Sequence, residues 1–147
     1  MSKSKGFEHF YIGIHNETFY SKEEILERLS EDYIRGIIEG EGCFCSDRRS
    51  NGEKIPSFTL TMHIRDRELL EAIRDHLGLT CPVYTYNYRE KNYTGRQRAT
   101  LIIRDVATLK NTIVPLFKNK LLGFKGTQFD FWLKKFPYLN SLAYRED

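Results

Sequence analysis

The sequence predicts an α+β fold in which helices cover one face of a four-stranded antiparallel sheet. Segments that alternate apolar and polar residues occur in two pairs, and each pair is followed by a segment whose apolar residues have helical spacing. A further helical segment precedes the first pair, so the elements follow in the order α-β-β-α-β-β-α-α. Each predicted strand has only one apolar face. The helices are therefore expected on that face, and the other face is expected to be open.

The other elements are arranged around the first strongly predicted helix. Ser30 is a favourable N-cap, and Ile34 and Ile38 follow it at helical spacing. Gly36 and Gly40 are four residues apart and therefore share one face of the helix. A glycine costs about 1 kcal/mol relative to alanine in a helix interior. We therefore expect another backbone to approach this face closely.

The C-terminal end of this helix is acidic. The helix is expected to end between Gly40 and Gly42, which places Glu39 and Glu41 where the helix dipole disfavours anions. A bound cation would resolve this conflict. Residues two apart do not share a helix face, so we expect one glutamate to serve a site and the other to have a structural role.

The remaining elements follow from the same periodicities. Asn51 and Gly52 form a strong turn signal between the first two strands, and Gly78 ends the helix that follows them. Thr127 is the expected N-cap of the last helix. The predicted strands span residues 43–49, 55–64, 83–89 and 96–104, and the predicted helices between and after them span residues 66–77, 105–116 and a segment beyond residue 127.

Residues 1–29 are interpreted as an N-terminal extension of a domain at residues 30–147. The first twenty residues are rich in large apolar side chains, so we expect the extension to pack on the domain. Ser21 and Glu24 have the spacing of a capping box, which predicts a short helix ending near Arg28.

The composition limits the classes of protein and partner. The net charge is +3, so a nucleic-acid partner has to be argued from where charges cluster. No apolar run reaches the length of a membrane span and no signal peptide is recognisable. We therefore expect an intracellular protein, cytoplasmic or organellar, without a membrane partner. Cys43, Cys45 and Cys81 are odd in number and lack the spacing of a zinc site, so inert thiols are expected.

Residues 34–42 resemble the motif of LAGLIDADG homing endonucleases, with glutamates where the family name has aspartates. Tyr33, Cys43 and Phe44 resemble the family as well, and with the order of the elements the resemblance covers residues 30–136. It implies an αββαββα fold with a saddle-shaped sheet. It also implies cleavage of both strands of a long, pseudo-palindromic DNA site, leaving short 3′ overhangs. Such proteins are usually encoded by mobile introns. A single motif implies a homodimer with half of the active site in each subunit.

The resemblance implies an active site at the acidic end of the motif helix. Glu41 matches the metal ligand and the Gly40 carbonyl matches a second ligand, whereas Glu39 is interpreted as structural. The implied cofactor is Mg²⁺ or another hard cation such as Mn²⁺, and Ca²⁺ is expected to bind without supporting cleavage. If two copies pack about a two-fold axis, both Glu41 side chains converge, and converging carboxylates need a cation. The expected dimer interface comprises Tyr33, Gly36, Ile37 and Gly40.

Two further catalytic positions are implied. The family has a basic residue near the reacting phosphate, and Lys120 fits it best by spacing, with Lys118 and Lys125 as alternatives. The family often has a glutamine late in the second strand, which this chain lacks. Either His63 or Thr61 takes its place, or water alone serves there.

The open face of the sheet carries the polar side chains that are expected to contact DNA. An arginine there can read guanine through a bidentate bond worth roughly 1–3 kcal/mol. On the third strand either the tyrosines or Thr85, Asn87 and Arg89 face the groove, and we favour the tyrosines. The expected contacts are Cys45, Asp47, Arg49, Ser57, Thr59, Thr61, Tyr84, Tyr86, Tyr88, Arg96, Arg98 and Thr100.

Two other functions compete with cleavage. A DNA- or RNA-binding protein on the same fold, such as an intron maturase or a regulator, would keep the sheet and lose the metal site. The intact Glu41 argues against this alternative, and the missing glutamine leaves it open. Intron RNA is therefore a further candidate partner. A plain structural dimer is the weakest alternative.

Overall fold

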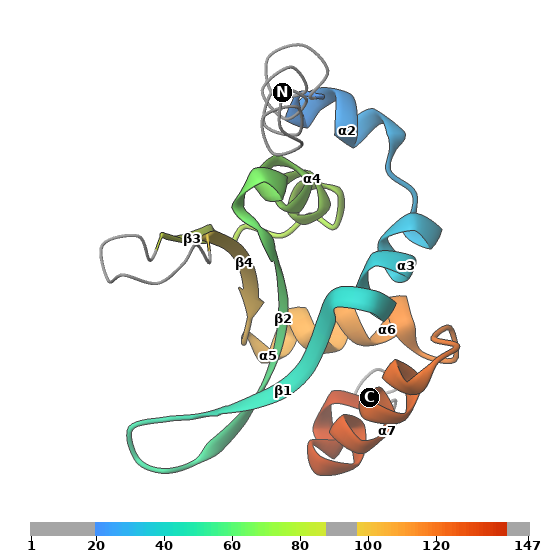
Figure 1. Cartoon of the computed structure of the whole chain (residues 1–147). Helices are drawn as coiled ribbons and strands as arrows, with labels where there is room; N and C mark the ends of the chain where they lie inside the picture. The colour runs from blue at the N-terminus through green and yellow to red at the C-terminus, as the bar shows by residue number, and fades with distance from the viewer. Residues whose placement is uncertain (1–19, 88–96, 141–147) are drawn as a thin grey trace, which may run out of the picture.

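One antiparallel sheet forms the centre of the computed structural model, which describes residues 20–87 and 97–140. Its strand order is β1-β2-β4-β3, and helices lie against one of its faces (Figure 1). The strands are β1 (Gly42–Arg48), β2 (Lys54–His63), β3 (Val83–Asn87) and β4 (Gln97–Ile103). This architecture confirms the predicted α+β fold.

Helices precede, separate and follow the strand pairs, as expected. They are α2 (Lys22–Arg28), α3 (Glu31–Glu41), α4 (Arg67–His76), α5 (Val106–Thr108), α6 (Val114–Phe117) and α7 (Phe124–Lys135). Within the described residues, three further turns join or follow them, namely the 3₁₀ turns η1 (Ile64–Asp66) and η4 (Pro137–Asn140) and the π-helical turn η3 (Leu109–Ile113). Within the described ranges, no helix has the length and apolar character to cross a membrane.

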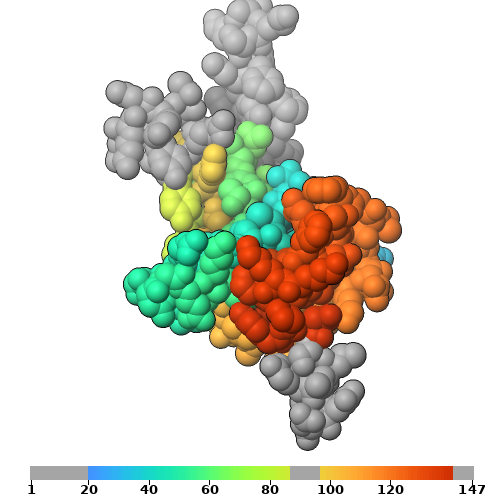
Figure 2. Space-filling view, turned by 90° about the horizontal axis from the view of Figure 1, so that it is seen from below, coloured from blue at the N-terminus to red at the C-terminus, as the bar shows by residue number. Residues whose placement is uncertain are grey.

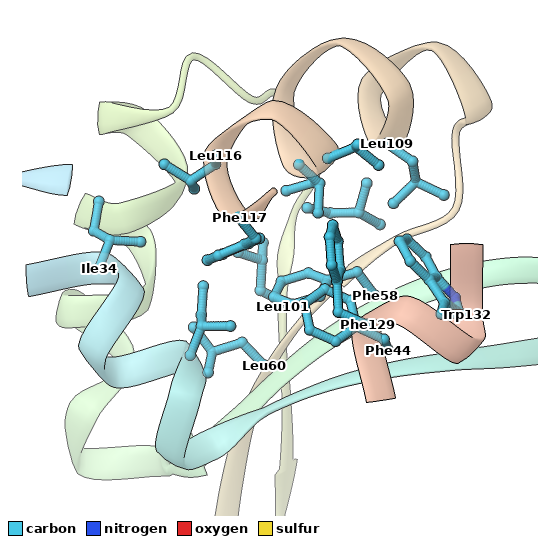
Figure 3. Packing of buried hydrophobic residues seen from close by; sticks show 14 of the residues in the cluster. Ile34, Phe44, Phe58, Leu60, Leu101, Leu109, Leu116, Phe117, Phe129 and Trp132 are labelled. Atoms are coloured by element: carbon cyan, nitrogen blue, oxygen red, sulfur yellow. The ribbon is translucent and has the colours of Figure 1, made fainter. Parts of the chain in front are cut away.

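The strand register places the apolar residues on one face of the sheet. Phe58 of β2 pairs with both Phe44 of β1 and Ile103 of β4, and Leu60 pairs with Leu101. All five are buried, and they lie in one cluster with side chains from α3, α6 and α7 (Figure 3). The opposite face, defined by the alternate residues of each strand, is called the open face below.

Aromatic rings fill the space between the sheet and α7. The Phe44 ring lies 5.0 Å from the ring of Phe129 and 5.1 Å from that of Trp132, measured between centroids. Trp132 Nε1 donates a hydrogen bond of 2.8 Å to the carbonyl oxygen of Cys45, so its polar atom is satisfied. These contacts attach α7 to the edge strand β1.

The helical region after β4 is divided by a π-helical turn. Asp105 caps its start, because Asp105 Oδ2 accepts hydrogen bonds from the backbone N–H and the hydroxyl of Thr108. Pro115 lacks a backbone N–H, and its ring would crowd the carbonyl of Asn111 in a regular α-helix. The wider π turn is consistent with this constraint.

The predicted start of the last helix was wrong. The helix begins at Phe124 with Gly123 as its N-cap, so Thr127 lies inside it. The first backbone N–H groups of this helix find their acceptor in Glu39, which is far away in the sequence. A local cap was therefore not required.

The short helix α2 has the predicted capping box between Ser21 and Glu24. It lies against α4, where Lys22 Nζ is 3.0 Å from Asp75 Oδ2. Arg74 and Lys22 lower the pKa of the Asp75 carboxyl, mainly by hydrogen bonding to it. This end of the predicted extension therefore packs on the domain, while residues 1–19 lie outside the described ranges.

Candidate functional site

The two faces of α3 differ in burial. Ile34 and Ile38 are 0% and 1% exposed and belong to the core. Gly36 and Gly40 are exposed, and a Cβ atom built on either would meet no atom within 4 Å. Tyr33 on the same side is 52% exposed. Tyr33, Gly36 and Gly40 therefore form a face that the described part of this chain leaves uncovered, whereas Ile37, the fourth predicted interface residue, is half-buried and packs against the core.

The third glycine of the motif has a different role. Gly42 is buried at the junction of α3 and β1, and a Cβ atom there would lie 2.7 Å from Cγ2 of Ile38. No side chain can be added without moving the helix or the strand. Gly42 thus permits the close turn by which the chain leaves α3 and enters the sheet.

Arg35 joins the motif helix to α6. Its Nε donates a 2.7 Å hydrogen bond to the carbonyl oxygen of Leu116, which lacks an intrahelical donor at the helix end. Its guanidinium also contacts Asp32 at 2.7 Å and Glu31 at 3.2 Å. No pattern in the sequence singled out Arg35, although the acidic Asp32 and Glu31 lie three and four residues before it.

Glu39 connects the end of α3 to the start of α7. Its carboxylate accepts a 3.0 Å hydrogen bond from the backbone N–H of Leu122 and another bond from that of Gly123. The N-terminal end of a helix favours an anion, so this carboxylate stabilises α7. These contacts give Glu39 the structural role that was expected for it.

Glu41 lies at the last position of α3 and is exposed. Within residues 20–87 and 97–140, its carboxylate makes no hydrogen bond or ion pair. The adjacent Gly42 carbonyl accepts a 2.6 Å hydrogen bond from Nζ of Lys125 on α7. Lys125 therefore supplies the cation at the acidic helix end.

The three lysines considered in the sequence occupy different environments. Lys118 Nζ donates a 2.7 Å hydrogen bond to Asn140 Oδ1, which directs it toward η4. Lys120 is exposed in a turn after Asn119, whose φ is 61°. Only Lys125 has a hydrogen bond to the end of the motif helix, so the structure favours this alternative, and the role of Lys120 stays a prediction.

His63 has a local structural contact. Its Nδ1 accepts a 3.1 Å hydrogen bond from the backbone N–H of Arg65 and so caps η1. In the register, Leu60 is the partner of Gly42, so Thr61 lies nearer to the end of α3 than His63 does. The catalytic role of His63 stays a prediction, and Thr61 is the better-placed substitute for the missing glutamine.

The open face has the parity that was favoured for the third strand. Tyr84 pairs with Thr100 and Tyr86 pairs with Arg98, whereas Val83 pairs with the buried Leu101. Tyr84 and Tyr86 are 46% and 38% exposed. Arg98 is exposed on the same face. The expected contacts Tyr88 and Arg96 lie outside the described residues.

Two expected contacts on this face are buried, and each lies against another expected contact. Ser57 is fully buried beside Cys45, with 3.3 Å between its Oγ and the Sγ of Cys45. Thr100 is also buried, and its hydroxyl is 3.1 Å from that of Thr61. The prediction of accessible contacts at Ser57 and Thr100 was wrong, because small side chains in the central strands β2 and β4 are covered by their neighbours.

Asp47 is paired with Arg104, whose Nε donates a hydrogen bond to its carboxylate. The sequence analysis missed Arg104 because the two residues are 57 positions apart. Arg49 is exposed beyond the end of β1, near the turn to β2. The polar residues of the open face thus include an ion pair at one end.

Comparison with known proteins agrees with this geometry. The sequence profile of LAGLIDADG endonucleases matches residues 34–136, which includes the motif helix, the sheet and α7. This chain belongs to the LAGLIDADG endonuclease family. The match begins at Ile34, inside α3, so α2 precedes the matched region. The match ends just after α7.

Solved structures of LAGLIDADG proteins have the same fold. The homing endonuclease I-TnaI is 27% identical over 72% of this chain and 70% of its own, with a TM-score of 0.56. I-LtrWI bound to target DNA is 22% identical over 80% of this chain and 38% of its own, with a TM-score of 0.60. I-GzeII in complex with its DNA target is also 22% identical, over 80% and 40%, with a TM-score of 0.56. The chain spans less than half the length of I-LtrWI and I-GzeII.

Proposed function

We propose that two copies of this LAGLIDADG chain form a metal-dependent homing endonuclease that cuts both strands of a specific DNA site. One observation carries the proposal. The motif helix combines an uncovered glycine face with an exposed carboxylate, Glu41, that makes no polar contact within the described residues. In a single copy the two glycines only weaken the helix, and the carboxylate has no partner. A second copy would pack against the glycines and bring a second carboxylate to the first.

The proposed dimer forms through the exposed face of α3 that carries Gly36 and Gly40. Two such faces can approach closely because Gly36 and Gly40 have no side chains, and Tyr33 and Ile37 would pack beside them. A two-fold axis along this face brings the two copies of Glu41 together at one end. Each subunit then contributes half of the site.

The donor set supports a hard divalent cation. Within the described ranges, no three His, Cys, Asp or Glu side chains lie together, so one chain offers too few ligands. Two Glu41 carboxylates and two Gly40 carbonyls would provide the oxygen ligands that suit Mg²⁺ or Mn²⁺. The bound ion would supply activation of water and stabilisation of the leaving oxygen of a phosphodiester. Lys125, already held at Gly42, and Lys120 would place positive charge near the phosphate.

The open face would contact the DNA. Tyr84, Tyr86 and Arg98 would lie in the major groove of one half-site, and the second copy would cover the other half. A two-fold symmetric dimer favours a long, pseudo-palindromic target. Encoding by a mobile intron belongs to the same proposal, and it would make the uninterrupted exon junction the target.

Cleavage and binding by Glu41→Gln test the proposal. A plasmid library selects a cleavable target for the wild type in Mg²⁺, and the variant is then assayed on that target by cleavage and by gel shift in Ca²⁺. We expect cleavage to fall by several orders of magnitude while binding persists, because affinity arises mainly from phosphate and base contacts. Glu31→Gln makes the same chemical change at an exposed glutamate in the first turn of α3 and serves as the control.

Three outcomes would contradict the proposal. Full cleavage by Glu41→Gln would remove the metal assignment. Equal loss of binding and cleavage would give Glu41 a role in assembly instead. Binding without cleavage by the wild type, in Mg²⁺ and in Mn²⁺, would favour the non-cleaving alternative.

A further inference from the structure

Three cations lie together at the far end of the β1–β2 hairpin, on the helix side of the sheet. Arg48 pairs with Lys54 in the register, and their parity is that of the buried Phe44 and Phe58. Lys135 ends α7, which packs along β1. The ammonium of Lys135, and then the Arg48 guanidinium, lower the pKa of Lys54. Both cations are therefore close enough to Lys54 to repel its ammonium, and the three residues are called the basic cluster below.

The nearby carboxylates do not neutralise the basic cluster. Glu53, next to Lys54, lies 3.7 Å from Arg49, and Asp47, next to Arg48, is paired with Arg104 on the open face. No described carboxylate is among the groups that shift the pKa of Lys54. Like charges that are held together without a counter-charge favour binding of an anion.

A shallow hollow of about 240 Å³ adjoins the basic cluster. Its lining combines Lys135 with Ser46, Gln128 and aromatic side chains that include Phe131 and Trp132. Phe131 is 64% exposed, which is unusual for a side chain of its size. The hairpin and α7 lie side by side in both views of the molecule (Figures 1 and 2).

This combination indicates the chemistry of the ligand. The hollow is smaller than the roughly 300–1,000 Å³ typical of sites for drug-sized ligands, so it suits one planar ring rather than a whole small molecule. Proteins bind single-stranded nucleic acid by stacking bases on exposed aromatic rings beside cations that contact the phosphates. A duplex does not offer the faces of its bases, because they are stacked on each other. An unpaired strand therefore fits Phe131 and the basic cluster better than a duplex does.

We propose that the hairpin end and the last turns of α7 form a binding surface for single-stranded nucleic acid, separate from the open face. Phe131 stacks on one base, and Lys135, Lys54 and Arg48 contact the neighbouring phosphates. Gln128 and Ser46 lie in the hollow beside the stacked base. The surface goes beyond the proposed cleavage function and does not require it.

Fluorescence anisotropy of labelled decathymidine and decauridine with the full chain tests this surface. Both are used because they share the phosphate and a pyrimidine ring, which differs only by the methyl group of thymine. We expect Phe131→Ala to weaken binding by roughly tenfold, from the loss of one stacked base. Lys54→Gln with Lys135→Gln should weaken binding further. This pair should also reduce the slope of log affinity against log salt by about 1.4, which corresponds to two phosphate contacts on a single strand.

A matched control makes the test specific. Lys134→Gln removes the same charge from the neighbouring, exposed position of α7 and should change affinity less than twofold. Thermal melting confirms folding, and Lys135→Gln should melt no lower than the wild type because one of two repelling ammonium groups is removed.

Either of two results would overturn the proposal. One is wild-type binding by Phe131→Ala and by the double lysine variant, and the other is an equal loss with Lys134→Gln. The assay needs neither duplex nor cleavage, so failure here is distinguishable from failure of the endonuclease proposal.

Discussion

The two faces of the eleven-residue helix α3 have opposite environments. The face with Ile34 and Ile38 is completely buried in the core of its own chain. On the other face, a Cβ atom added to Gly36 or Gly40 would touch nothing within 4 Å, although glycine weakens a helix by about 1 kcal/mol relative to alanine. The first face explains why the chain folds. The second face reduces the stability of a single copy, so its benefit has to come from a contact outside the described chain.

The end of the helix repeats the contrast in its two acidic residues. Glu39 is occupied by the backbone of Leu122 and Gly123, whereas Glu41 makes no polar contact within the described ranges. Glu39 therefore stabilises the fold, whereas the carboxylate of Glu41, two residues later, remains available to bind a ligand. Substitutions on each side of this boundary should affect stability and assembly differently.

Replacing Ile38 by alanine should have the largest effect on the stability of the chain. Ile38 is 1% exposed and packs in the main core, so its truncation should cost about 2–5 kcal/mol, the range for large-to-small changes in cores. Urea unfolding followed by circular dichroism measures the change. Ile37→Ala, one residue earlier and half-buried, is the comparison and should cost much less in the monomer. Equal losses would mean that the two faces do not differ.

Gly40→Leu should act almost entirely on assembly. No atom lies within 4 Å of the added Cβ, so the folded chain has room for the side chain, while a second helix could no longer approach. We expect dimer formation to weaken by at least a hundredfold, which is about 2.7 kcal/mol. Sedimentation at micromolar concentration measures the effect. A dimer of unchanged affinity would place the interface elsewhere.

Glu39→Gln should cause an intermediate loss of stability. The substitution keeps one acceptor for the N–H groups of Leu122 and Gly123 but removes the charge that the start of α7 favours. We expect a cost of about 1–2 kcal/mol, since hydrogen bonds to charged groups contribute roughly 1.5–3 kcal/mol each. Thermal melting of the variant is compared with that of Glu41→Gln. An equal cost for both variants would contradict the distinction between the two glutamates.

The sequence predicted what depends on local pattern. The strands, the caps at Ser21 and Ser30, and the placement of Gly36 and Gly40 on one helix face all follow from periodicity or local hydrogen bonding. The register gives the tyrosines of β3 the orientation that was favoured, because Tyr84 pairs with Thr100 and Tyr86 with Arg98.

The sequence did not predict contacts between residues far apart in the chain. The start of α7 depends on Glu39, which lies more than 80 residues earlier, and the hydrogen bond from Lys125 to the Gly42 carbonyl spans 83 residues. The burial of Ser57 depends on its neighbours in the sheet. Each of these features is set by tertiary packing, which one sequence does not display.

The smallest effect should come from Gly36→Ala, and it should have opposite signs in two measurements. Alanine has room at this position, so it should stabilise the monomer by about 0.5–1 kcal/mol through the helix preference. In the dimer the added methyl group should separate the two helices and weaken association. The stability is measured by urea unfolding in the Gly40→Leu background, where the chain is expected to be monomeric, and the association by sedimentation without that change. Gly42→Ala is the matched control. Its Cβ would lie 2.7 Å from Ile38 Cγ2, so the same substitution two residues beyond Gly40 should destabilise the monomer. If Gly36→Ala and Gly42→Ala shifted the stability of the monomer in the same direction, the distinction between the exposed glycine face of α3 and the close-packed junction at Gly42 would be wrong.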